Sequence, residues 1–124
     1  MQLNIGNKDY TIHLGIDALA YLDDKYNTIE PTTGLKIGYG VTALNAYLEM
    51  ANVLALVTFI KAGTSTEYQK PSNKDIEEYL GSLELEDLDK LFKEAQDELG
   101  KQPLTRLAIK RTEKAIAEEA KKKA

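Results

Sequence analysis

The feature that most constrains the fold is an apolar segment in the middle of the chain. Residues Met50–Ile60 contain no charged side chain. A membrane-spanning helix needs about 20 such residues, and the flanking Glu49 and Lys61 would be costly inside a bilayer, by about 2.5–3.5 kcal/mol for a charge at its centre. We therefore expect no membrane segment but a central core helix over residues 41–62. Its most buried positions should include Leu54, Leu56, Val57 and Ile60.

The length and composition of the chain predict a single globular domain. The 124 residues can form one core, and 43% hydrophobic with 29% charged residues is ordinary for a folded protein. The chain has no cysteine, which excludes disulfides and thiolate metal sites. The first ten residues show no basic stretch followed by an apolar one, so no secretory signal is expected.

Alternating apolar residues at the N-terminus predict a β-hairpin. The alternation continues on both sides of Gly6-Asn7, a dipeptide typical of tight hairpin turns. His13 falls on the opposite face and is expected to be exposed. Residues 35–39 alternate in the same way and predict a third short strand. The alternating residues of the hairpin are Leu3, Ile5, Tyr10, Ile12 and Leu14.

The rest of the chain predicts helices. Spacings of three and four residues begin at Ile16 and are clearest over residues 85–99. Ser72, with Asp75 three residues later, predicts one helix start, and Pro103 suits another. The expected fold is α+β, mainly α, with the N-terminal β-hairpin packed on a helical bundle of about five helices around the central apolar helix. The helices should cover residues 16–26, 41–62, 72–81, 85–99 and 104–122.

Charge divides the chain into two parts. Residues 1–100 hold 8 basic and 17 acidic side chains, whereas residues 101–124 hold 8 basic and 3 acidic ones. Such asymmetry is typical of an interaction arm or of self-complementary assembly. We therefore predict a globular domain over residues 1–100 and a basic C-terminal helix over 101–124. This helix should act as a weakly docked arm, attracted to the acidic residues 72–100.

The sequence shows no motif typical of a catalytic, metal-binding or phosphate-binding site. His13 is the only histidine, and no G-x-S-x-G motif supplies a nucleophile. No calcium-type loop occurs, and the sequence GYG at 38–40 lacks the rest of a phosphate-binding loop. The chain is acidic overall and has no aromatic residue after Phe92, which disfavours nucleic acid as a partner. We expect no enzyme activity, no cofactor and no metal.

Two interpretations of the apolar stripe over residues 85–99 stay open. The stripe is either core or, in part and together with Tyr79, an exposed groove for a partner helix or a second copy of the chain. The candidate partner-binding residues are Tyr79, Leu88, Phe92, Arg106, Lys110, Arg111 and Lys114.

The layout of the whole chain resembles a known family. The segments that carry the likeness are IGNKDYTIHLGIDALAYLDDKY (5–26), GYGVTALNAYLEMANVLALVTFIKAGT (38–64) and PSNKDIEEYLGSLELEDLDKLFKEAQDELGKQPLTRLAIK (71–110). In this order they are similar to the tail assembly chaperones of long-tailed bacteriophages that infect Gram-positive hosts.

This resemblance implies a protein that is not an enzyme and is absent from the finished virion. Members bind the tape-measure protein in the host cytoplasm, keep its apolar helices from aggregating, and help recruit tail-tube subunits. The expected mode is an amphipathic partner helix in an apolar groove. The family commonly makes a longer product by ribosomal frameshifting, and lysine codons for Lys121, Lys122 and Lys123 are rich in adenine.

Two other classes of protein remain as alternatives. A head–tail connector would stay in the phage particle, so its presence in purified virions would favour it. A small helical DNA-binding regulator would bind duplex DNA with an affinity that falls as salt rises.

Overall fold

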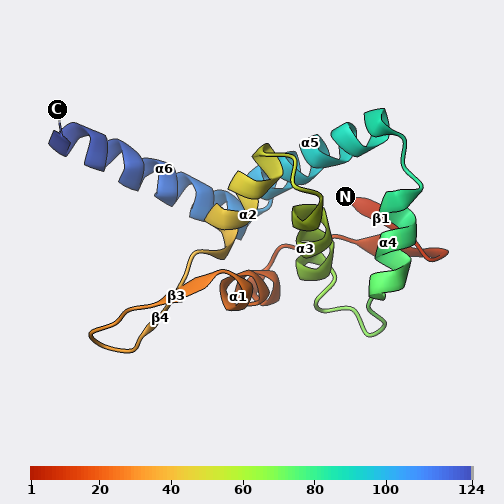
Figure 1. Cartoon of the computed structure of the whole chain (residues 1–124), viewed down its shortest axis with the longest axis horizontal. Helices are drawn as coiled ribbons and strands as arrows, with labels where there is room; N and C mark the ends of the chain where they lie inside the picture. Colours follow the sequence, from red (N-terminus) through yellow and green to blue (C-terminus); the bar gives the residue numbers. More distant parts are fainter. Residues whose placement is uncertain (124) are drawn as a thin grey trace.

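The structure is a computed structural model in which residues 1–123 are described, and most of them are helical (Figure 1). The expected α+β, mainly α, fold with an N-terminal hairpin is confirmed. In chain order the elements are β1 (Gln2–Ile5), β2 (Lys8–Thr11), α1 (Ile16–Lys25), β3 (Asn27–Ile29), β4 (Lys36–Gly38), α2 (Gly40–Glu49), α3 (Val53–Gly63), α4 (Asn73–Gly81), α5 (Leu85–Lys101) and α6 (Pro103–Lys123).

The N-terminal hairpin forms as the alternation predicts. Strands β1 and β2 are antiparallel, with Leu3 opposite Tyr10. The turn residues Gly6 and Asn7 have φ angles of 59° and 63°, the left-handed conformation that tight hairpin turns require. The apolar face packs into the core, and His13 is exposed as expected.

The expected single central helix is wrong: the segment forms two helices, α2 and α3. Helix α2 ends at Glu49, and two residues later Ala51 adopts the left-handed conformation, with φ of 55°. Its amide donates to the Leu48 carbonyl at 3.0 Å, and the Asn52 amide donates to the Tyr47 carbonyl at 3.1 Å, which satisfies the last turn of α2. The Asn52 side chain then accepts from the Leu54 amide at 2.9 Å and caps the start of α3.

The break changes which residues of the apolar segment are buried. Leu56, Phe59 and Ile60 are 0% exposed and form the centre of the core. Leu54 was expected to be among the most buried residues, but its side chain is 63% exposed. Val57 is only half-buried. The new helix start turns one apolar side of α3 toward solvent, because a core on one side of a helix cannot enclose its whole circumference.

A second two-stranded sheet projects from the body next to α1 (Figure 1). The strand expected at residues 35–39 forms as β4, and it pairs with β3, which the sequence did not predict. At the tip, the Glu30 carboxylate accepts from the amides of Thr32 and Thr33 and from the Thr33 hydroxyl. These hydrogen bonds, that of the Thr33 hydroxyl above all, lower the pKa of Glu30 to about 2.

The apolar face expected for the first helix is partly wrong. The helical spacing of apolar residues begins at Ile16, yet this side chain is 77% exposed at the start of α1. Ala18 and Leu22 are the residues that α1 buries. Helix α1 packs against α2 and α3, and Ile16, its first residue, lies outside that contact.

Helices α5 and α6 meet at a joint held by side chains. Helix α5 continues past Gly100 to Lys101, and α6 begins at Pro103 as expected. The Gln102 side chain accepts from the Leu14 amide at 2.7 Å and donates to the Ile12 carbonyl at 2.9 Å. These bonds tie the joint to the end of the N-terminal hairpin. Beyond it, α6 extends away from the body (Figure 1).

Candidate partner-binding groove

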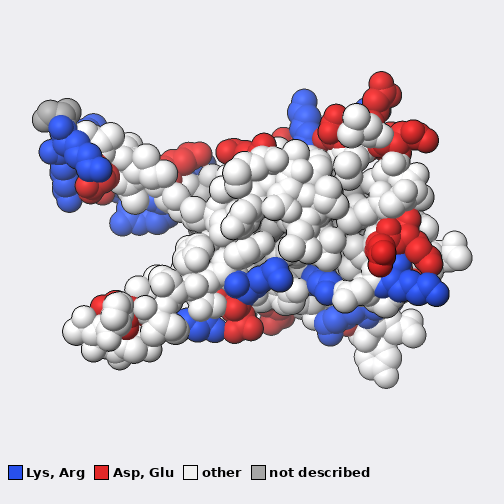
Figure 2. All heavy atoms as spheres, viewed as in Figure 1, with Lys and Arg blue, Asp and Glu red and all other residues white. Residues whose placement is uncertain are grey.

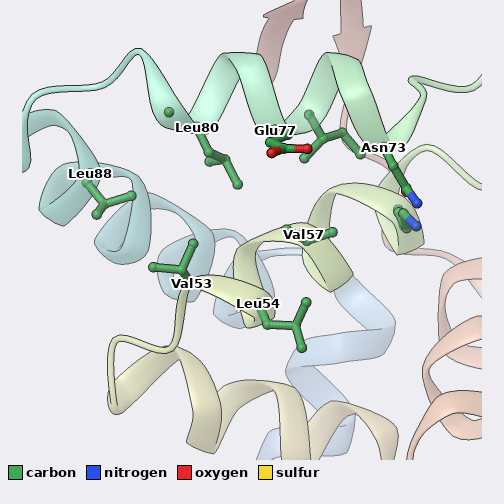
Figure 3. Close-up of a pocket in the computed structure, with 10 residues that line it drawn as sticks. Val53, Leu54, Val57, Asn73, Glu77, Leu80 and Leu88 are labelled. Carbon is green, nitrogen blue, oxygen red and sulfur yellow. The ribbon is translucent and has the colours of Figure 1, made fainter.

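An apolar groove of about 580 Å³ lies between α3 and α4, beside the start of α5 (Figure 3). We call it the α3–α4 groove. Its apolar lining is contributed by three segments that are distant in sequence. These residues are Val53, Leu54 and Val57 from α3, Ile76 and Leu80 from α4, and Leu88 from α5.

The wall formed by α3 consists of apolar side chains left in solvent. Val53 is 48% exposed and Leu54 is 63% exposed, immediately after the Asn52 cap. Contiguous exposed apolar side chains on a folded protein commonly mark a binding surface. Leu56 and Ile60 anchor the other side of the same helix in the core, so the wall is already formed in the free chain.

The wall formed by α4 is held by a cap and a buried anchor. The Ser72 hydroxyl accepts from the Asp75 amide at 3.0 Å, which confirms the helix start expected at this serine. Ile76 is 1% exposed and anchors α4 to the body. Leu80, one turn later, remains half-buried and faces the groove (Figure 3).

The three apolar candidates for partner binding lie in three different environments. Leu88 lines the groove. Phe92 is 6% exposed and belongs to the core, as do Ala95 and Leu99 from the same stripe. Tyr79 is half-buried on α4 and does not line the groove; burial, and to a smaller extent the charge of Glu94, raise the pKa of its phenol.

The basic candidates lie elsewhere. Arg106, Lys110, Arg111 and Lys114 are exposed on α6, whose free end lies at the opposite end of the molecule from α4 (Figure 1). The ion pairs that α6 makes within residues 1–123 are internal, such as Lys114 with Glu118 at 3.9 Å. The expected contact between this helix and the acidic residues 72–100 is therefore not formed by ion pairs in this structure.

Most of the groove was not predictable from the periodicity of the sequence. Of its lining residues only Leu88 was a candidate for partner binding, and Leu54 and Val57 were expected in the core. One signal was present: Asn52 is a strong helix-capping residue inside an otherwise apolar run. Reading it as a helix start would have placed Val53 and Leu54 in a first turn, where side chains are less enclosed.

Among residues 1–123, no group of three His, Asp or Glu side chains is placed to hold a metal ion. None of the helices in this range is both long enough and apolar enough to cross a membrane.

Comparison with known proteins identifies the family. The family model described as "Phage tail assembly chaperone protein, TAC" matches residues 2–114, nearly the whole chain and every residue of the α3–α4 groove. No curated protein and no solved structure matches the chain significantly. The match covers the same order of segments that carries the resemblance noted in the sequence. The chain belongs to the phage tail assembly chaperone family.

Proposed function

We propose that this protein is a non-catalytic tail assembly chaperone that binds the tape-measure protein and helps recruit tail-tube subunits. It acts in the host cytoplasm and leaves before the virion is complete. Family membership supports the general role. The observation that carries the finer assignment is the α3–α4 groove, a preformed apolar surface with Val53 and Leu54 substantially exposed.

The groove suits an amphipathic helix. A partner helix presents apolar side chains at i, i+3 or i+4, and i+7 on one face. Full burial of each such side chain contributes about 1.5–3 kcal/mol, and the costs of association consume much of the total. Three inserted side chains therefore give a moderate affinity. Moderate affinity is what a chaperone needs if tube subunits are to displace it.

The test is co-purification with the tape-measure protein encoded by the same phage. Leu54→Asp places a carboxylate in the groove and should abolish co-purification. Ile16→Asp is the matched control, since Ile16 is also an exposed apolar residue in the first turn of a helix but lies outside the groove. Equal binding by both variants would show that the α3–α4 groove is not the tape-measure site.

The departure from the virion and a longer product are tested separately. We expect mass spectrometry to find the protein in assembling lysates and not in purified particles. The lysine run Lys121–Lys123 leads us to propose a frameshift site in its codons. The gene sequence should then contain a slippery heptamer and an overlapping frame, and a gene that lacks both would refute the longer product.

A further inference from the structure

One end of the α3–α4 groove is basic. Lys61 and Asn73 line this end, and a second hollow of about 350 Å³ continues past them with Lys70 in its wall. Neither lysine forms an ion pair within residues 1–123. Helix α4 also starts here, and its partial positive charge, which Asp75 in its first turn partly offsets, has the same sign as the lysines.

The other end of the groove is acidic. Gly81 and Leu88 line it, and the chain that joins these two residues carries Glu84, Glu86 and Asp87, all exposed and none in an ion pair within the described chain. Helix α4 ends at Gly81, so its partial negative charge has the same sign as these carboxylates, while the positive pole of α5, which begins at Leu85, offsets part of it.

The figures show the same polarity. Acidic side chains gather over the start of α5, whereas over α4 acidic and basic side chains lie side by side, with the basic ones toward the lower end, where that helix begins (Figure 2). In Figure 3, Leu80 and Leu88 lie at one end of the groove and Asn73 at the other. Glu77 lies between them on the α4 wall and adds negative charge midway.

The length of the groove sets the size of its occupant. Asn73 and Gly81 are eight residues apart on α4, which corresponds to about 12 Å of helix axis. A guest helix spans this distance in about two turns, from position i to i+7 or i+8. Charged residues just outside these two turns then lie over the two ends of the groove.

We propose that the α3–α4 groove binds a charge-polarised amphipathic helix of its partner. The basic end of that helix lies over Glu84, Glu86 and Asp87, and its acidic end lies over Lys61 and Lys70. Charge order, not chain direction, orients the guest. The inference rests on the proposed function and adds to it the chemistry of the tape-measure segment: an apolar two-turn face with Lys or Arg at one end and Asp or Glu at the other.

The test uses two synthetic peptides of roughly 16 residues with the same apolar face. One carries lysines at its N-terminus and glutamates at its C-terminus, and the other has the reverse order. Each carries a nitroxide tag at its acidic end, and amide signals of the full-length protein are followed by NMR. In both complexes the tag should broaden the amides of Lys61 and Asn73 more strongly than those of Gly81 and Leu88.

Charge reversal in the protein supplies the second measurement. Lys61→Glu combined with Lys70→Glu should weaken both peptides about tenfold at low salt, and less as salt screens the exposed charges. Lys110→Glu with Arg111→Glu is the matched control on α6 and should leave the affinity unchanged. A peptide that binds with the same chain direction whatever its charge order would overturn the inference and leave the proposed function standing.

Two other outcomes would refute the groove assignment or the proposed guest. If neither peptide perturbs the groove and Leu54→Asp still co-purifies with the tape-measure protein, the groove assignment itself fails. If the amides of Val57 and Leu80 shift with protein concentration in the absence of peptide, a second copy of the chain occupies the groove, and the proposed guest is wrong.

Discussion

The most informative test compares the effect of Leu54→Asp on stability with the effect of Leu56→Asp. The sequence predicts that both leucines are buried, but the structure buries only one of them. Leu54 is 63% exposed on the groove wall, whereas Leu56 is 0% exposed in the core. The same chemical change should therefore have very different effects on the free energy of unfolding.

At Leu54 the contributions of the substitution to the free energy of unfolding are small and partly cancel. Full burial of a leucine is worth about 1.5–3 kcal/mol, so its one-third buried fraction contributes under about 1 kcal/mol. Replacing Leu with Asp in a helix costs roughly 0.5 kcal/mol. Position 54 lies in the first turn of α3, where a negative charge gains about 0.3–1 kcal/mol from the helix dipole. The expected net destabilisation is about 1 kcal/mol or less.

At Leu56 every contribution of the substitution lowers the free energy of unfolding. Truncating a buried leucine alone costs about 2–5 kcal/mol, and an unpaired carboxylate in the core costs several more. Domains of this kind have a total stability of about 5–15 kcal/mol. Leu56→Asp should therefore unfold the protein or leave it marginally stable.

Urea unfolding followed by circular dichroism measures both variants. With a slope of about 1–3 kcal/mol per molar urea, Leu54→Asp should move the midpoint by about 1 M or less. Leu56→Asp should show no folded baseline. If Leu54→Asp unfolds as Leu56→Asp does, then Leu54 is a core residue and the break between α2 and α3 has been placed wrongly.

Three further predictions follow from the packing and the charges. Phe92→Ala should cost about 3–5 kcal/mol in urea unfolding, because Phe92 is a core residue; a normal midpoint with lost partner binding would instead place it in a groove. The Glu30 carboxyl should titrate in NMR with a pKa near 2, below its ordinary 4.5. The stabilisation of the β3–β4 tip by this carboxylate is therefore fully present above pH about 4.5 and is lost as the pH falls toward 2. A pKa near 4.5 would contradict the hydrogen bonds at the tip. Amide exchange in α6 should be slow up to Thr112, whose hydroxyl lies 3.0 Å from that of Thr42, and fast over residues 113–123, which are all exposed; uniformly slow exchange would exclude a free end.

Elements with strong local signals were predictable from the sequence. The β1–β2 hairpin follows from alternation around Gly6-Asn7, because only a few residue types adopt the left-handed conformation that its turn requires. The start of α6 follows from Pro103, since proline is favoured in a first turn and cannot donate within a helix. The family was also within reach of the sequence, because its likeness extends through the order of these elements.

The groove depended on tertiary structure. Residues 53–60 are apolar or small on every side of the helix, so their periodicity contains no information on which side is buried. That choice was made by the break at Ala51 and by the packing of α1, α2 and α5 against Leu56, Phe59 and Ile60. The sequence by itself determined which segments are apolar, where the N-terminal hairpin turns and where α4 and α6 begin. Only the assembled helices decided that Val53 and Leu54 remain in solvent beside Leu80 and Leu88, because exposure depends on neighbours that are distant along the chain.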